Sequence, residues 1–382
     1  MNIMLPHSAY PGAHARRAGF SLIEMMIALL LGALVVAGLI NVLMANRQAY
    51  HLQEADNYNQ QNMRFAMDRI GWSLRQASFW GAVKPNVISG SPAVGQTTAS
   101  CTQAWVLAVS NPVYGYDGAS SFPVGSDCVP AYVSGTDVLV VRYAGPDAVP
   151  WSAATAPTLN AKQVYLETRA GMTAQLFSGS YIQTYPYVNG AAPQEGTYIY
   201  PYSFEAYYLR PCSNADSSGK CSASSDGGNP IPTLMRMRLD SSGNLITEPV
   251  VEGVEQLQFE YGIRDPNGTS PVPIRYEDAT TATTKGDWAN VISVRIGYVL
   301  RSATRDTRVP HPFDSQTTDV TQANYPRRLS GDCEYKVASD GTASITSGCT
   351  GFGTGSLGDK PQQYTRIQMT AVVQLRNPIR QI

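Results

Sequence analysis

The first eighty residues contain two stretches with different patterns of apolar and polar positions. Residues 20–44 are apolar except for one acid, Glu24. A helix of this length, at about 1.5 Å per residue, spans the roughly 30 Å hydrocarbon core of a bilayer. An acid inside such a segment costs about 2.5–3.5 kcal/mol near the bilayer centre, so a carboxylate there indicates a function. The pattern predicts a transmembrane helix with a functional acid near its start.

Helical periodicity continues beyond the apolar stretch. No proline occurs in residues 45–80, and apolar residues recur there at helical spacing: Leu52, Ala55, Tyr58, Met63, Met67, Ile70 and Leu74. This pattern predicts an amphipathic helix that packs its apolar face on another element and ends before Gly81 and Pro85. We therefore expect one long helix over residues 20–80, half in lipid and half docked on a globular domain.

Beyond residue 81 the pattern changes to an alternation with period two. We expect strands at residues 104–110, 137–143, 204–209, 235–239, 257–263, 292–300 and 367–375. Such segments fit antiparallel sheets with one buried face. The predicted fold class is α+β: a long N-terminal helix packed on a mainly antiparallel β-sheet head. Residues 213–232 and 302–364 are expected to be long loops, and residues 81–382 to form either one domain or two subdomains.

The composition agrees with an exported β-rich protein. The chain has 382 residues, of which 15% are charged, with a net charge of -1 and abundant Gly, Pro and Tyr. A near-neutral chain shows no broad electrostatic footprint for nucleic acid. The low content of charged residues is more typical of a secreted protein than of a cytosolic enzyme.

Six cysteines follow the apolar stretch, and an even number on the exported side of a membrane indicates disulfides. Nearest-neighbour pairing gives Cys101–Cys128, Cys212–Cys221 and Cys333–Cys349. Six cysteines allow 15 connectivities, so this pairing is a hypothesis based on loop length. The alternative is that the thiols are free and buried.

A short basic leader precedes the apolar stretch. Arg16 and Arg17 lie just before Gly19, and their charge favours a cytoplasmic N-terminus. An ordinary secretory signal has its cleavage site after the apolar stretch, whereas here the small residue precedes it. A twin-arginine signal would leave Glu24 unexplained. A plain membrane anchor would leave both Glu24 and the Gly19-Phe20 junction as coincidences.

The junction resembles the processing site of type IV prepilins, because Gly19, Phe20, a Glu at the fifth mature position and an apolar run all coincide. Together with residues 253–262, 288–296 and 371–378, it resembles the PilW family of type IV pilus minor pilins. The resemblance implies that a prepilin peptidase cuts between Gly19 and Phe20 and methylates Phe20. It also implies that Glu24 pairs with the N-terminal amine of a neighbouring subunit.

The resemblance implies a chain organisation, a location and partners. Residues 1–19 would be a leader, residues 20–80 the long helix and residues 81–382 a periplasmic or extracellular head. The protein would cross the inner membrane once and then reach the pilus or cell surface. Its partners would be other minor pilins, the major pilin, the prepilin peptidase and the inner-membrane assembly platform.

The expected function is that of a minor pilin which primes assembly of a type IV pilus or caps it. A type II secretion pseudopilin shares Gly19, Phe20 and Glu24, and is the first alternative. A pilus-tip adhesin that binds through its disulfide-bearing loops is the second. We do not expect an enzyme.

Motifs for catalysis or cofactor binding are weak. His51 and His311 are far apart, and no cofactor is indicated. Residues 353–358 match GxGxxG, but no amphipathic helix follows, as a dinucleotide site would require. Asp265 and Asn267, with Glu277 and Asp278 downstream, could offer oxygens to Ca²⁺. An ordinary hairpin turn is the favoured interpretation of this segment.

Overall fold

The computed structural model describes residues 21–95, 97–150, 158–169, 173–180, 197–222, 224–228, 230–267, 270, 272–302, 334–337, 343–347 and 366–377. The chain divides into two compact units, Met1–Glu54 and Ala55–Ile382. Helix α1, Leu22–Gln76, continues from the first unit into the second. The predicted leader, His311 and residues 353–358 lie outside the described residues.

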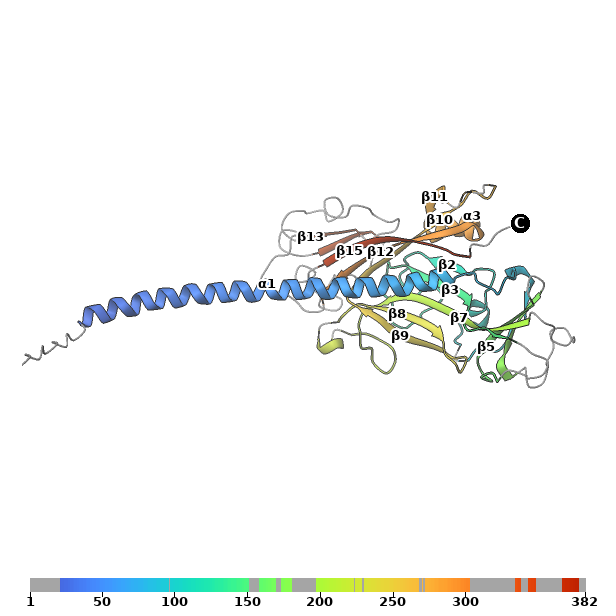
Figure 1. The fold of residues 1–382 in the computed structure, drawn as a ribbon, viewed down its shortest axis with the longest axis horizontal. Helices are drawn as coiled ribbons and strands as arrows, with labels where there is room; N and C mark the ends of the chain where they lie inside the picture. The colour runs from blue at the N-terminus through green and yellow to red at the C-terminus, as the bar shows by residue number, and fades with distance from the viewer. Residues whose placement is uncertain are drawn as a thin grey trace, which may run out of the picture. The chain divides into compact units, whose positions relative to one another are not determined.

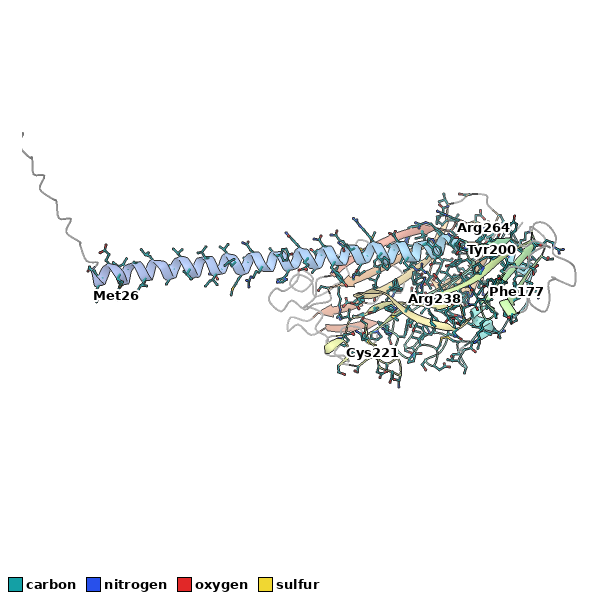
Figure 2. All side chains as sticks on the ribbon, turned by 60° about the horizontal axis from the view of Figure 1, so that its bottom comes forward. Met26, Phe177, Tyr200, Cys221, Arg238 and Arg264 are labelled. Atoms are coloured by element: carbon teal, nitrogen blue, oxygen red, sulfur yellow. A yellow bond between two sulfur atoms is a disulfide. The ribbon has the colours of Figure 1, made fainter. Side chains whose placement is uncertain are left out.

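In the first unit, the described residues other than Ser21 belong to α1, and most of them form its apolar part. Its most apolar window has a mean hydropathy of 2.6, which makes α1 long and apolar enough to cross a membrane. Large apolar side chains are exposed along this part, and Met26 is 62% exposed (Figure 2). Exposed apolar surface of this extent is typical of a segment that contacts lipid or other proteins.

The second unit contains the rest of α1, three sheets and short helices (Figure 1). The largest sheet has nine strands in the order β1-β6-β5-β7-β3-β2, with β4 and β8 also paired to β7, and β9 to β8. Its strands are β1 (Ile88–Ser89), β2 (Val113–Tyr116), β3 (Val138–Ala144), β4 (Val149–Pro150), β5 (Val164–Arg169), β6 (Thr173–Ser178), β7 (Thr197–Arg210), β8 (Thr233–Leu239) and β9 (Leu245–Glu252). All pairs are antiparallel except β1 with β6.

A second sheet has four antiparallel strands in the order β11-β10-β12-β15. These strands are β10 (Val254–Ile263), β11 (Arg275–Glu277), β12 (Val291–Arg301) and β15 (Arg366–Gln374). A separate hairpin pairs β13 (Glu334–Val337) with β14 (Ala343–Ser347). The helical segments after α1 are α2 (Gln103–Val106), α3 (Ala279–Lys285), η1 (Pro85–Val87), η4 (Ser225–Gly227) and η5 (Asp287–Asn290).

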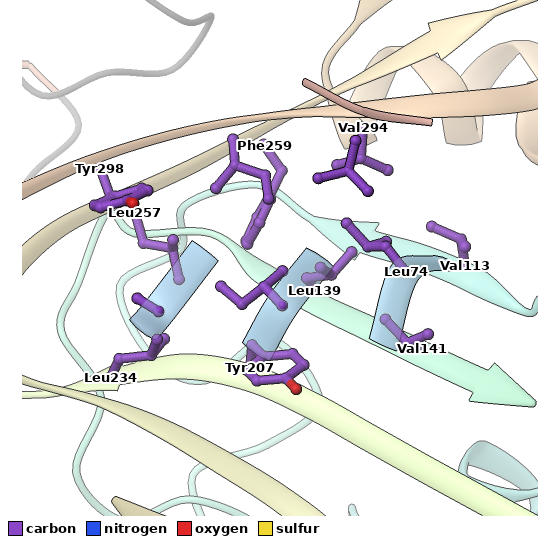
Figure 3. Packing of buried hydrophobic residues seen from close by; sticks show 14 of the residues in the cluster. Leu74, Val113, Leu139, Val141, Tyr207, Leu234, Leu257, Phe259, Val294 and Tyr298 are labelled. Carbon is purple, nitrogen blue, oxygen red and sulfur yellow. The ribbon is translucent and has the colours of Figure 1, made fainter. Parts of the chain in front are cut away.

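The second half of α1 packs between the two larger sheets (Figures 1 and 3). Buried residues recur along it every three or four positions, which is the period of one helix face: Asn59, Met63, Ala66, Ile70 and Leu74. Leu74 lies in one cluster with Val141 of β3 and with Phe259 and Val294 of the four-stranded sheet. The helix therefore supplies apolar surface to both sheets at once.

The opposite face of the nine-stranded sheet carries a second apolar cluster. Along β3, Leu139 and Val141 face the α1 cluster, whereas Val138 and Val140 face the other side. Trp80 belongs to this second cluster and stacks on Tyr202, with ring centroids 6.2 Å apart. Strand β3 is thus buried on both faces.

The predicted α+β class is confirmed, with a long apolar N-terminal helix followed by a mainly antiparallel sheet. Six of the seven expected strand segments overlap β3, β7, β8, β10, β12 and β15. The expectation of one solvent-facing side was wrong for β12, since all its residues are buried. The alternate positions of β12 include Arg295, which forms an ion pair with Glu260 at 2.5 Å.

Residues 104–110 were wrongly predicted as a strand, because the segment begins with helix α2. The side-chain oxygen of Thr102 accepts a hydrogen bond from the Trp105 backbone N–H at 3.2 Å, which caps the helical turn. The guanidinium of Arg142 donates to the carbonyl oxygens of Trp105 and Val106, at 2.6 and 3.1 Å. These contacts come from β3 and could not be read from the local pattern.

Two further boundaries differ from the predictions. The segment 302–364, expected as a loop, contains the paired strands β13 and β14. Helix α1 ends at Gln76 rather than near residue 80. The chain then turns through Ser78, whose φ is 64° and whose N–H donates to the Arg142 carbonyl at 3.2 Å.

Candidate assembly interface

A buried carboxylate joins helix α1 to the nine-stranded sheet. Glu205 of β7 accepts hydrogen bonds from the guanidinium groups of Arg69 on α1, at 2.8 Å, and of Arg236 on β8, at 2.9 Å. The Tyr207 hydroxyl donates to the same carboxylate at 2.8 Å, and the Ser73 hydroxyl also contacts it. A buried charge is tolerated when it is paired and hydrogen-bonded in this way. We call these five residues the Glu205 network.

The network keeps its groups in the protonation states that its hydrogen bonds require. Burial, and then the negative charge of Glu205, raise the pKa of the Tyr207 hydroxyl well above its ordinary value. Burial lowers the pKa of Arg69, but Glu205 together with the Tyr207 and Tyr143 hydroxyls more than offsets this effect, so the pKa is raised. The phenol therefore stays a donor, and the guanidinium stays charged, throughout the physiological pH range.

The face of α1 that is not buried carries aromatic residues at a spacing of seven. Tyr58, Phe65 and Trp72 are 43%, 57% and 38% exposed. The prediction that Tyr58 lies on the packed face of the helix was therefore wrong, since the next residue, Asn59, is the one that faces the core. The Arg69 guanidinium lies over the Trp72 ring, 5.3 Å from its centroid, and Trp72 also meets Tyr143 edge-on at 5.7 Å. We call Tyr58, Phe65 and Trp72 the exposed aromatic stripe. A spacing of seven is the repeat by which one α-helix packs along another.

The predicted processing site is only partly described. Gly19 and Phe20 lie outside the described residues. Glu24 lies in the first turn of α1, where an acid also interacts favourably with the helix dipole, and its side chain is exposed. Its proposed partner, the amine of another subunit, belongs to a different chain.

Two of the three expected disulfides are present, Cys101–Cys128 and Cys212–Cys221. The first connects the segment before α2 to a loop ahead of β3. The second closes a loop after β7, where Cys221 lies (Figure 2). Cys333 and Cys349 lie outside the described residues, so the third pairing stays a prediction.

The weak calcium candidate forms an ordinary local turn. The Asp265 Oδ1 accepts a hydrogen bond from the Asn267 backbone N–H at 3.0 Å. Glu277 instead pairs with Arg275 and Lys285, both at 2.5 Å, and the Asp278 side chain caps helix α3. The described residues contain no group of three or more His, Cys, Asp or Glu residues placed to hold a metal ion.

The sequence pattern did not predict the Glu205 network. The available signal was one acid, Glu205, within the apolar and aromatic segment that became β7. Its main partner Arg69 is 136 positions away in the sequence, and Arg236 is 31 positions away. Periodicity marked the helix face and the strand, but it could not match these charges to each other.

Comparisons with known proteins agree with this architecture. Residues 219–377 match the family described as Type IV Pilus-assembly protein W, or PilW, and residues 14–40 match the Prokaryotic N-terminal methylation motif. Neither the search of curated proteins nor that of solved structures found a match. The PilW match covers β8 to β15, and so includes the whole four-stranded sheet.

The methylation motif, the apolar N-terminal helix and the β-sheet unit support a class of protein, the type IV pilus-associated pilins. The match over residues 219–377 confirms the predicted resemblance to the PilW family. The family's role is structural rather than catalytic, and no finding indicates enzymatic activity. The N-terminal motif also implies processing by a prepilin peptidase and anchoring in a membrane.

The Glu205 network predicts an unequal response of two carboxylates to the same substitution. Glu205 is 6% exposed, whereas Glu248, which pairs with Arg236 and Arg238, is 30% exposed. We expect Glu205→Gln to lower the free energy of unfolding by about 3 kcal/mol, because the partly buried guanidinium groups of Arg69 and Arg236 each lose a carboxylate partner. Glu248→Gln, the control, should cost about 1 kcal/mol or less. Urea unfolding followed by circular dichroism measures both, and equal losses would contradict the proposed role of Glu205.

Proposed function

We propose that this chain is a minor pilin that acts with other minor pilins to prime assembly of a type IV pilus, or to cap it. The observation that carries the proposal is the exposed aromatic stripe on α1. One face of the helix is already covered by the two sheets of its own unit, so the stripe is the surface left for another subunit.

The spacing of the stripe indicates what kind of partner fits it. Side chains repeating every seven residues follow a nearly straight line along a helix and suit a second helix packed alongside. A neighbouring pilin offers such a helix. The unit Ala55–Ile382 is also large for a subunit repeated along a fibre, which supports a place at the tip.

We further propose that residues 1–19 are a leader removed by the prepilin peptidase, with Phe20 becoming the methylated N-terminus. The match to the methylation motif over residues 14–40 includes this junction and supports the proposal. Residues 20–44 would cross the inner membrane once, with the N-terminus cytoplasmic. Glu24 would pair with the N-terminal amine of a neighbouring subunit, since two charges in an apolar helix bundle are tolerable only as a pair.

The stripe predicts an assembly defect without a folding defect. Phe65 is exposed, so Phe65→Glu should change the free energy of unfolding by about 0.5 kcal/mol or less. A charge on the stripe should nevertheless reduce co-purification with other minor pilins at least fivefold. Gln60→Glu adds the same charge to an exposed position off the stripe and is the control. If both variants co-purify equally well, the stripe is not the interface.

The proposed role of Glu24 predicts a separation of anchoring from assembly. Glu24→Gln should remain in the membrane fraction, because it removes a charge from an apolar segment. Its amount in sheared pili should fall at least tenfold, because the pairing with a neighbour's amine is lost. Glu54→Gln makes the same change outside the apolar segment and should be recovered normally. Normal recovery of Glu24→Gln in pili would show that the charge is dispensable.

Deletion of the gene distinguishes the minor pilin from the pseudopilin. A priming subunit sets how often pili are initiated, so its loss should reduce surface piliation. Additional loss of pilus retraction should then restore piliation in part. Counting pili by electron microscopy, alongside secretion of a folded exoprotein, tests both functions. Unchanged piliation with failed secretion would establish the pseudopilin instead.

A further inference from the structure

Four aromatic side chains form a continuous row across the edge of the nine-stranded sheet. The Trp105 indole N–H of α2 donates to the Tyr116 hydroxyl at 3.0 Å. The rings of Tyr116 and Tyr114, both on β2, are 5.0 Å apart, and Tyr114 and Trp288 of η5 are 4.5 Å apart. All four side chains are partly exposed. We call these residues the aromatic row.

One end of the row is fixed by contacts that converge on α2. The disulfide Cys101–Cys128 holds the chain just before Thr102, whose side chain caps the helical turn. The buried guanidinium of Arg142 donates to the carbonyl oxygen of Trp105 at 2.6 Å, and to that of Asn111, just before β2, also at 2.6 Å. Trp105 and the strand carrying the two tyrosines are thus held by the same cation.

The other end is fixed by helix α3 and the four-stranded sheet. The Trp288 ring packs against Tyr261 of β10, with centroids 4.8 Å apart, and its indole N–H donates to the Thr283 hydroxyl at 3.1 Å. Asp117, next to Tyr116 in the sequence, accepts from the backbone N–H groups of Ala279 and Thr280, at 2.9 and 2.6 Å. The row therefore bridges two sheets and is held in place before any ligand arrives, which lowers the entropy cost of binding.

The chemistry of the row favours one class of ligand. Both indole N–H groups are already used within the protein, so these tryptophans offer ring surface rather than donors. A polyproline segment has no backbone N–H to donate to the carboxylate of Asp117, whereas a sugar has hydroxyl donors and can also place its C–H face on an aromatic ring. None of the four side chains carries a charge, and the carboxylate of Asp117 beside them can accept from a sugar hydroxyl.

We propose that the aromatic row, Trp105, Tyr116, Tyr114 and Trp288, is a binding site for an uncharged saccharide. The first three residues lie outside both family matches, which end at residue 40 and resume at residue 219, so the site is a property of this chain rather than of the matched segments. The proposal does not depend on the role in pilus priming. The aromatic row would be exposed in the same way on a minor pilin and on a pseudopilin.

The test uses the full-length protein in phosphatidylcholine nanodiscs, because maltoside detergents are themselves saccharides. An array of uncharged and acidic oligosaccharides identifies a ligand, and calorimetry then measures its affinity. We expect an uncharged oligosaccharide to bind, and Trp105→Ala to bind it at least tenfold more weakly. Tyr198→Ala, which removes an aromatic residue that is 41% exposed on β7 and outside the row, should bind within twofold of the natural protein.

A second measurement does not require a folded alanine variant. The five tryptophans of the natural chain can be labelled as 5-fluorotryptophan, and the variants Trp72→Phe, Trp105→Phe and Trp288→Phe assign three of the resonances. The bound oligosaccharide should shift the Trp105 and Trp288 signals and leave that of Trp72 in place. Binding of acidic glycans alone, binding of none, or unmoved Trp105 and Trp288 signals would overturn the proposal. Tighter binding of a polyproline peptide than of any glycan would also overturn it.

Discussion

Burial of one face of α1 between two sheets is the constraint on which the rest of the second unit depends. Met63, Ile70 and Leu74 lie in a single cluster with residues of both sheets. Neither sheet could bury its inner face without the helix, and a helix with this many polar residues gains its stability mainly from such packing. The helix is therefore part of the core of the head, and only its remaining face is free for other subunits.

The Glu205 network fixes the position of α1 along the sheet, which apolar packing alone does not do. Apolar surfaces tolerate small shifts of a helix along a sheet, but a carboxylate with two cations and two hydroxyls around it does not. A shift of α1 by one turn would take Arg69 and Ser73 away from Glu205 and leave a buried charge with fewer partners. The network thus fixes the register of the helix, and with it the position of the exposed aromatic stripe.

The sequence predicted the elements whose patterns are local. The helix was predicted from its period, and β3, β10, β12 and β15 from alternation or β-branched residues. The prediction failed at residues 104–110, where a capping Thr102 and the distant Arg142 favour a helical turn over a strand. It also failed on the exposure of β12, because the Arg295 side chain is buried by its ion pair with Glu260 and by the Tyr276 ring.

By itself, the sequence determined the apolar N-terminal helix, the Gly19-Phe20 junction with Glu24, the fold class and part of the buried face of α1, namely Met63, Ile70 and Leu74. Each of these depends on residues that are neighbours in the chain or repeat at a fixed short period. Only the tertiary structure decided that Arg69 meets Glu205, and that Trp105, Tyr114, Tyr116 and Trp288 form one row. These contacts depend on strand order and on how two sheets close around one helix, and periodicity carries no information about either.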